Sequence, residues 1–331
     1  MERLGFIDSI KGLAIILVVI GHVANGYLGQ GVTNVHHTVY NIIYAFHMPL
    51  FFTISGFLFY HAYFTKAGTI KRIKVKEQII NLICIYFVFS LLLCSTKMIF
   101  SGYVNNKTSL NNLLMLPIRP LDLYWYLYVL IIECFIFSRE VLIHKKKSIT
   151  LLFTLALAIL SYWITGRYGR LFCMNRVLYY MFFFYTGILL STNLDILKKR
   201  GLLFGLLPII LLLFVLFTGQ EKYINRIQFA NIIMGLSCSL CIFGAFYQYK
   251  ILGEDNRILS FIGTYCLEIY LLHTYFVTFC RSFLRLVKIS NPLLIYLISI
   301  FMGIIIPIVI ANICKKMGIY NYIFSPYKKA P

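Results

Sequence analysis

The first apolar stretch of the chain carries three ionisable residues along one helical stripe. Asp8 and Lys11 lie near its start, and His22 follows eleven residues after Lys11. Eleven residues at ~100° each end ~20° past three full turns, so Lys11 and His22 share one helix face, and Asp8 lies close to that face. Lys11 and His22 are ~16 Å apart along the helix axis. The stripe places a charge near one membrane surface and an imidazole, which can accept a proton near neutral pH, deeper in the bilayer. The structural alternative is that Lys11 extends to the interface and His22 hydrogen-bonds a neighbouring helix.

The second apolar stretch combines an imidazole with residues that shape a helix. His47 precedes Pro49, which lacks a backbone N–H, so we expect a kink that frees a carbonyl near Ala45. A freed carbonyl inside a membrane needs a partner or a water-filled cavity. Ser55 and Gly56 then permit a neighbouring helix to approach closely.

Composition places these residues in a membrane protein. The 331 residues are 60% hydrophobic and 13% charged, whereas soluble domains are ~25% charged. So many apolar residues do not fit one soluble core. The sequence predicts an all-α, polytopic fold in a single integral-membrane domain over residues 1–331, with about ten spans of the ~20 residues that a bilayer requires. The predicted spans are 8–27, 40–62, 78–97, 122–143, 149–165, 173–191, 201–218, 228–249, 258–279 and 292–314.

The distribution of Lys and Arg predicts the orientation. These residues outnumber Asp and Glu 31 to 11, for a net charge of +20. Most of them fall in loops on the side that also holds both termini, which we therefore predict to be cytoplasmic, in agreement with an even number of spans. We interpret the charge as a topology signal that also contacts anionic lipid headgroups. The expected partner is therefore membrane lipid, not nucleic acid. The first span is too long for a signal peptide, and we expect it to be retained.

Motifs at four places resemble the acyltransferase-3 family of integral-membrane acyltransferases, and within it the fucose 4-O-acetylase-like branch. The two more specific motifs are Asp8-x-x-Lys11-x10-His22 and Phe46-His47-Met48-Pro49-Leu50-Phe51-Phe52 with Ser55-Gly56. The two weaker ones are Leu123-Tyr124-Trp125-Tyr126-Leu127 and Ser260-Phe261-Ile262-Gly263-Thr264 with Glu268-Ile269-Tyr270-Leu271-Leu272-His273. The resemblance covers most of the chain. The family's first-helix cation is usually Arg; Lys11 keeps its charge but lacks the planar fork for bidentate bonds.

The resemblance implies transfer of an acyl group, usually acetyl from acetyl-CoA, to a hydroxyl of a cell-envelope sugar in a bacterial cytoplasmic membrane. Such a transfer needs a base for the hydroxyl proton and a charge that stabilises the oxyanion. We interpret His22 as the base, within a candidate catalytic set of His22, Lys11, Glu268 and Asp8. A carboxylate would orient the imidazole. Asp8 is too far along the axis, so Glu268, at a similar depth in a continuous last-but-one span, is the first choice and Glu133 the second.

Basic residues after the second span predict the donor site. Cations suit the three phosphates of CoA, and the family places a basic cluster here; a topology signal is the alternative. The candidate cofactor-binding residues are Lys71, Arg72, Lys74 and Lys76. The candidate acceptor-binding residues are His47, Ser55, Tyr124, Trp125 and His273. Tyr124 and Trp125, at the predicted outer start of the fourth span, suit stacking on a sugar ring, although an ordinary aromatic belt has the same composition.

Three classes of function remain open at this point. The first is a membrane O-acetyltransferase with acetyl-CoA as donor, a sugar or glycan as acceptor and no metal, since Cys238 and Cys241 have no second pair. The second is a secondary transporter or flippase for a sugar or lipid-linked glycan that uses intramembrane His and Glu as proton relays, although no internal repeat is visible. The third is a non-catalytic assembly subunit. No motif indicates the acceptor or an oligomeric state.

Overall fold

The structure is a computed structural model that describes residues 4–27, 34–65, 68–99, 108–144, 147–164, 169, 171–194, 197, 210, 228–249, 252–254, 256–288 and 291–327. Across these residues the regular elements are helices, with one isolated bridge between Phe64 and Ile70. The predicted all-α fold is therefore confirmed. The chain divides into two compact units, unit 1 from residues 1–54 and 193–317 and unit 2 from residues 55–192 and 318–331. Helix α2 (Asn34–Tyr63), which continues through Pro49, contributes to both units.

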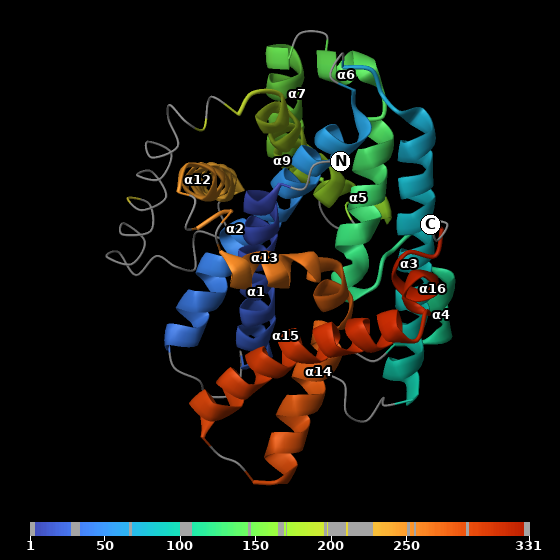
Figure 1. Ribbon diagram of the computed structural model, residues 1–331, viewed down its shortest axis with the longest axis vertical. Helices are drawn as coiled ribbons and strands as arrows, with labels where there is room; N and C mark the ends of the chain where they lie inside the picture. Colours follow the sequence, from blue (N-terminus) through green and yellow to red (C-terminus); the bar gives the residue numbers. More distant parts are fainter. Residues whose placement is uncertain are drawn as a thin grey trace. The chain divides into compact units, whose positions relative to one another are not determined.

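Unit 1 is built around α1 (Gly5–Tyr27), which packs against several later helices of the chain (Figure 1). These are α12 (Gln228–Gln248), α13 (Arg257–Thr264), α14 (Cys266–Leu286) and α15 (Pro292–Lys316). Helices α14 and α15 also pack against each other. Because α1 has neighbours on several sides, it buries apolar residues around much of its circumference, among them Ile7, Ile10, Ala14, Ile15 and Val19.

Glycines bring the backbone of α13 against the first turns of α1. A Cβ atom at Gly12 would overlap the carbonyl oxygen of Leu259, and a Cβ atom at Gly263 would overlap the carbonyl oxygen of Asp8. From the first of these contacts to the second, the position on α1 falls from residue 12 to residue 8, while the position on α13 rises from residue 259 to residue 263. The two helices are therefore antiparallel. A residue without a side chain is therefore required on each side of this interface.

The predicted span 258–279 is wrong as a single helix. Helix α13 ends at Thr264, whose hydroxyl donates to the carbonyl oxygen of Phe261 at 2.7 Å, and α14 begins at Cys266. A Thr side chain that bonds its own helix carbonyls competes with the regular backbone pattern. Glu268 therefore lies in the first turn of α14. Its depth cannot be counted from residue 257 along a continuous span.

The junction between α13 and α14 is anchored to the C-terminal end of α15. The hydroxyl of Tyr265 donates to the side-chain oxygen of Asn312 at 2.7 Å. The ammonium of Lys315 lies 4.2 Å from the centroid of the same ring, in cation–π geometry. Tyr265 is 8% exposed, so both interactions form at a buried corner that fixes where α14 starts.

Unit 2 packs α3 (Arg72–Ile99) against α5 (Trp125–Ile136), α5 against α9 (Met174–Thr192), and α9 against α7 (Lys147–Leu160) (Figure 1). Its core is aromatic, since the ring of Phe137 stacks on those of Phe184 and Tyr185 with centroids 5.4 and 5.6 Å apart. The shorter elements are α4 (Leu110–Leu114), η1 (Asp122–Tyr124), α6 (Glu140–His144), η2 (Leu171–Cys173) and α16 (Tyr320–Phe324).

The structure supports part of the predicted set of spans. Six of the described helices are long and apolar enough to cross a membrane, and they match the predictions at 8–27, 40–62, 78–97, 173–191, 228–249 and 292–314. The span predicted at 122–143 is interrupted, because α5 ends at Ile136 and the hydroxyl of Ser138 donates to the carbonyl of Phe135. The span predicted at 149–165 corresponds to the shorter helix α7. The span at 201–218 lies outside the described residues. The total of about ten spans and the side of the termini stay predictions.

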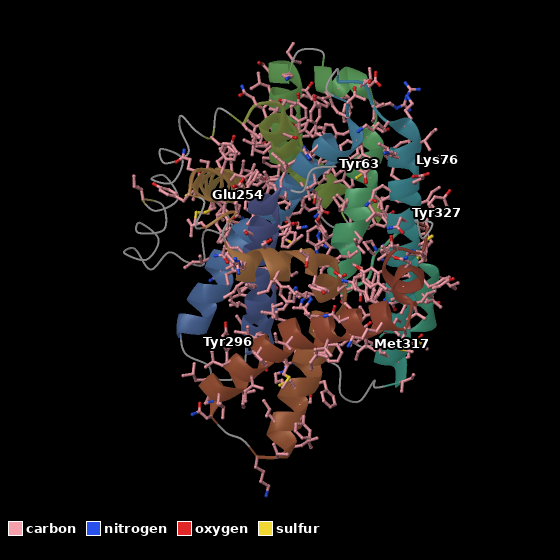
Figure 2. All side chains as sticks on the ribbon, in the orientation of Figure 1. Tyr63, Lys76, Glu254, Tyr296, Met317 and Tyr327 are labelled. Carbon is pink, nitrogen blue, oxygen red and sulfur yellow. The ribbon has the colours of Figure 1, made fainter. Side chains whose placement is uncertain are left out.

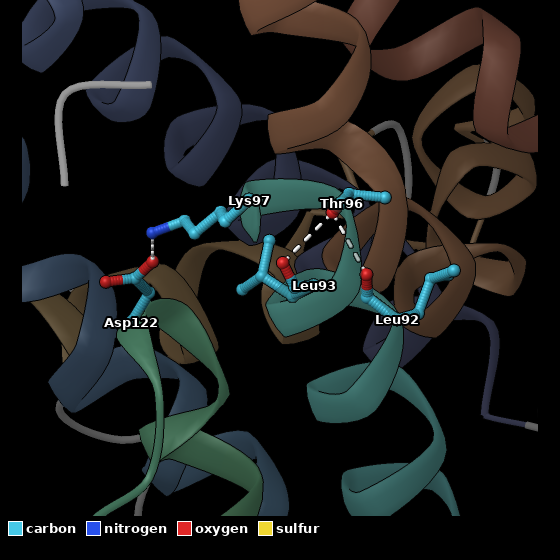
Figure 3. A network of polar contacts seen from close by, with 5 residues as sticks. All are labelled: Leu92, Leu93, Thr96, Lys97 and Asp122. Atoms are coloured by element: carbon cyan, nitrogen blue, oxygen red, sulfur yellow. Dashed lines mark hydrogen bonds and ion pairs between the residues drawn. The ribbon is translucent and has the colours of Figure 1, made fainter. Parts of the chain in front are cut away.

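An ion pair between Lys97 and Asp122 joins the end of α3 to η1 (Figure 3). Next to it, the hydroxyl of Thr96 donates to the carbonyl oxygens of Leu92 and Leu93, at 3.0 Å each. We expect Lys97→Met and Asp122→Asn each to lower the free energy of unfolding by about 1 kcal/mol or less, because the partners are not fully desolvated. Asn tolerates the positive φ of 40° at this position. Thermal unfolding in detergent measures this loss of stability. A coupling energy between Lys97 and Asp122 well above about 1 kcal/mol in a double-mutant cycle would contradict the prediction.

Candidate active site

The charged residues at the start of α1 are paired with each other. The Lys11 ammonium lies 2.7 Å from the Asp8 carboxylate, three residues earlier on the same helix. Gly263 packs against the carbonyl group of Asp8, and Glu268 follows five residues later in the first turn of α14. Asp8, Lys11 and Glu268 thus form a charged cluster where α1 and α14 begin.

Further along α1, His22 lies beside a second imidazole. The ring centroids of His22 and His273 are 5.0 Å apart, with the planes inclined at 56°. His273 is fully buried, whereas His22 keeps part of its surface exposed. His273 follows Glu268 by five residues, ~7.5 Å along the helix. The sequence predicts Glu268 of this helix as the partner of His22, and that pairing stays a prediction. The structure places His273 of the same helix beside His22.

The tautomer of His273 follows from its hydrogen bonds. Its Nδ1 lies 2.9 Å from the carbonyl oxygen of Ile269 and 3.0 Å from that of Tyr270. Carbonyl oxygens only accept, so the proton resides on Nδ1 and Nε2 carries the lone pair. Within the described residues this Nε2 is buried and has no hydrogen-bond partner. A buried acceptor without a partner costs about 1–3 kcal/mol, and such groups call for a functional explanation.

An aromatic row extends from this pair toward α2. The His22 ring lies 6.2 Å from that of Tyr44, and the Tyr44 ring lies 4.7 Å from that of His47, measured between centroids. The Nδ1 of His47 donates to the carbonyl oxygen of Ile43 at 2.7 Å, so its Nε2 is also the basic nitrogen. We call His273, His22, Tyr44 and His47 the histidine row. Sequence reasoning missed Tyr44, although its spacing of three residues from His47 indicates a shared helix face.

A hydrogen bond and a close helix approach hold α14 along α1. Beyond the histidine row, the Nη1 of Arg281 donates to the carbonyl oxygen of Gly26 at 2.8 Å. Next to the histidine row, α15 approaches both α14 and α1 at Gly303. A Cβ atom there would lie 2.8 Å from a Val277 methyl group and 3.0 Å from a Val19 methyl group. The position of His273 beside His22 is therefore set by three helices of unit 1.

The remaining acceptor candidates lie in unit 2. The hydroxyls of Ser55 and Tyr126 are hydrogen-bonded at 2.7 Å. Tyr124 is fully buried. Trp125 is half-buried and stacks on Tyr180, with centroids 5.3 Å apart and planes inclined at 28°.

Glu133 has an unusual environment on α5. Its side chain is fully buried, and neither carboxyl oxygen has a hydrogen-bond partner in the described part of the chain. Glu133 belongs to unit 2, whereas His22 and His273 belong to unit 1. Its role as the second-choice partner of His22 stays a prediction.

The basic segment before and at the start of α3 is largely exposed. Lys71 is half-buried, with its ammonium 3.5 Å from the carbonyl oxygen of Ala62. Arg72, Lys74 and Lys76 are exposed, and Lys76 projects from the outward side of α3 (Figure 2). Three cations within the first turns of one helix are free to reach a polyanion. In the described residues, no group of three His, Cys, Asp or Glu side chains is arranged to hold a metal ion.

Comparison with known proteins shows which family the chain is similar to. The family description of an acyltransferase domain matches residues 4–312. Nodulation protein NolL of Mesorhizobium japonicum is 30% identical over 154 residues, which is 46% of this chain and 39% of that protein. Nodulation protein NolL of Sinorhizobium fredii is 30% identical over 129 residues, which is 38% of this chain and 33% of that protein. The chain thus matches well under half of the length of these curated relatives. No solved structure gives a significant match.

Proposed function

Because the chain belongs to the acyltransferase-3 family, we propose that it is an O-acetyltransferase of the bacterial cytoplasmic membrane. The donor is cytoplasmic acetyl-CoA, and the acceptor is a hydroxyl of a cell-envelope sugar or polysaccharide precursor. The observation that carries the proposal is the pair of imidazoles, His22 and His273, of which His273 presents a buried nitrogen lone pair without a partner. Acyl transfer to a hydroxyl needs a proton acceptor in a site that excludes bulk water. In the proposal His22 is that acceptor, and the lone pair of His273 orients it.

In the proposed mechanism His22 is the general base. It takes the proton of the acceptor hydroxyl while the oxygen attacks the thioester carbonyl. The tetrahedral intermediate then collapses, the carbon–sulfur bond breaks, and CoA leaves as a thiol with the proton that His22 returns. His273 acts as a positioning residue: when the substrate is bound, its Nε2, which has no partner among the described residues, accepts the N–H of His22 and leaves the other nitrogen of His22 free for the substrate. This arrangement follows the logic of a catalytic triad with an imidazole in place of the carboxylate.

The charged cluster belongs to the donor side of the proposed site. Lys11 lies ~16 Å along α1 from His22, too far to stabilise an oxyanion formed at His22. We assign Lys11, held by Asp8 and near Glu268, to the path by which the donor enters. Lys71, Arg72, Lys74 and Lys76 are proposed to bind the phosphates of CoA, and His47, Ser55 and Trp125 to contact the acceptor.

Purified protein reconstituted in lipid and supplied with labelled acetyl-CoA and a panel of sugars tests the function. An acetylated sugar, heavier by about 42 Da (the mass of the added C₂H₂O), supports the enzyme. Movement of a sugar across the membrane without product would instead support the transporter.

Neutralising the exposed basic residues tests the donor site. We expect Lys74→Gln with Lys76→Gln to raise the KM for acetyl-CoA several-fold and leave kcat nearly unchanged, because the lost contacts act equally in the ground and transition states. The effect shrinks at high salt, since exposed charges are screened. A topology reporter at the C-terminus serves as the control. An unchanged KM with altered topology would assign these residues to orientation alone.

A further inference from the structure

The end of unit 2 opposite the basic segment carries the described cations Lys97 and Arg176. Helix α3 begins at Arg72, and Lys97 lies roughly 37 Å further along its axis. The ion pair of Lys97 with Asp122 places the start of α5 at this end, and the contact between Arg176 and Trp125 places the start of α9 there too. In the sequence, residues 97–125 and 165–176 contain Asp122 as their one acid and six cations, which are Lys97, Lys107, Arg119, Arg167, Arg170 and Arg176.

This charge is on the side of the membrane where cations are disfavoured. The predicted orientation makes this end the outer one, and Lys and Arg are normally kept on the cytoplasmic side. Six cations in sequence segments that are predicted to lie outside therefore indicate that an anion binds there. Such an anion approaches from outside the cell or from the outer leaflet.

The guanidinium of Arg176 is the best-defined of these cations. It lies 4.3 Å from the centroid of the Trp125 ring, and Trp125 in turn stacks on Tyr180. Within the described residues no carboxylate forms an ion pair with Arg176. The four acids of unit 2 account for this: Asp122 binds Lys97, Glu140 accepts from the backbone of Ile70, Glu133 is fully buried, and Glu77 lies at the opposite end of α3.

Stacking leaves the binding capacity of Arg176 intact. A guanidinium placed over an indole ring uses its π face, and its N–H groups point outward from its edges. Those edges match a carboxylate or a phosphate through two parallel hydrogen bonds. The indole also fixes the guanidinium in place, so less side-chain freedom is lost when the anion binds. Aromatic rings beside a fixed cation are suited to a sugar that carries an acidic group.

We propose that Arg176, Trp125 and Tyr180 form a subsite for an anionic sugar, one that bears a carboxylate or a phosphate. The acidic group binds the edge of the Arg176 guanidinium, and the sugar ring lies against the aromatic pair. The inference rests on the proposed function, since it gives the acceptor its chemical class. It distinguishes an acidic glycan precursor from a neutral one.

The two tryptophans of the chain make this subsite directly observable. Trp163 is 76% exposed and lies outside the subsite, so a Trp163→Phe variant leaves Trp125 as the one indole reporter. The protein, in phosphatidylcholine nanodiscs at constant ionic strength, is titrated with glucuronate, glucose 1-phosphate and glucose while the emission is recorded. We expect a saturable change with one or both anionic sugars and none with glucose. An equal response to glucose, or no response to any of them, overturns the proposal.

Matched variants assign the response to Arg176. In the Trp163→Phe background, Arg176→Gln is expected to raise the half-saturating concentration at least tenfold. Arg119→Gln, which removes the same charge from an exposed residue at the same end, is expected to change it less than twofold. An equal effect of the two variants would mean general charge attraction and would overturn the subsite.

A lipid arm separates the two sources of an anionic group. Nanodiscs that contain phosphatidylglycerol are compared with phosphatidylcholine alone, without sugar. If the lipid reproduces the spectral change and blocks the response to the sugars, Arg176 binds headgroups and the acceptor assignment fails. The binding assay needs no turnover, so the two failures can be told apart. Binding of an anionic sugar without any acetyl transfer would keep the subsite and refute its role as an acceptor site together with the proposed function.

Discussion

Replacing His22 with alanine is expected to lower the kcat of acyl transfer by about 10²–10⁴-fold, the usual contribution of a general base. Of the three histidines in the histidine row, His22 is the one whose residue is partly exposed, and the buried His273 lies beside it. The measurement is the initial rate of transfer from labelled acetyl-CoA by purified protein that remains monodisperse.

Three comparisons separate a base from a structural histidine. Exogenous imidazole is expected to restore part of the activity of His22→Ala, because it can enter the space left by the side chain. His273→Gln added to His22→Ala is expected to cost little more, since residues that act as a unit are not additive. His61→Ala, which removes another buried and unpartnered imidazole nitrogen, but in unit 2, serves as the control and should retain activity. Full activity of His22→Ala would end the proposed mechanism.

Replacing Gly263 with alanine is expected to destabilise unit 1 by about 1–3 kcal/mol, the usual cost of overpacking. The new Cβ atom would overlap the backbone carbonyl of Asp8, and a carbonyl inside a helix cannot rotate away. Alanine favours a helix by up to ~1 kcal/mol over glycine, so the observed loss understates the steric cost. Thermal unfolding in detergent measures the effect.

Gly5→Ala is the matched control for this prediction. It has the same effect on the unfolded chain, but its Cβ atom would lie 3.5 Å from the Cα atom of Glu254, an ordinary van der Waals contact. We expect its unfolding temperature to stay close to that of the natural sequence. If both variants unfold alike, the close approach of α13 to α1 is not what holds the charged cluster together.

Much of the fold is local enough to be predicted from the sequence. The helical class and the six long apolar helices follow from the length of the hydrophobic segments. A segment surrounded by lipid must form all its backbone hydrogen bonds within itself, which a helix does. The pairing of Asp8 with Lys11 also follows from spacing alone, since residues three apart lie on one helix face. The motifs of the first two helices indicate the family as well, because each motif lies within a single apolar segment.

The errors arose where a side chain or a neighbouring helix overrides hydrophobicity. The break at Tyr265 depends on Thr264 bonding the carbonyl of Phe261 and on Tyr265 reaching Asn312, a residue 47 positions away. The bond of Thr264 to Phe261 joins residues three apart and can be anticipated from the local sequence. The bond of Tyr265 to Asn312 cannot, because the two residues are far apart in the chain. The depth of Glu268 was counted along a single helix, and this count does not apply because α13 ends at Thr264 and α14 begins at Cys266.

The sequence by itself therefore determined the helices, their apolar lengths and the ionisable stripe of α1, since each depends on residues within a few turns of one another. Only the tertiary structure decided that His273 lies beside His22 and that Arg176 lies over Trp125. The first pair is separated by about 250 residues and the second by about 50, and their distances depend on how closely whole helices approach. That approach depends on small residues and side-chain shapes at the helix interfaces. The hydrophobic pattern of one segment does not show which other segment it packs against or how closely.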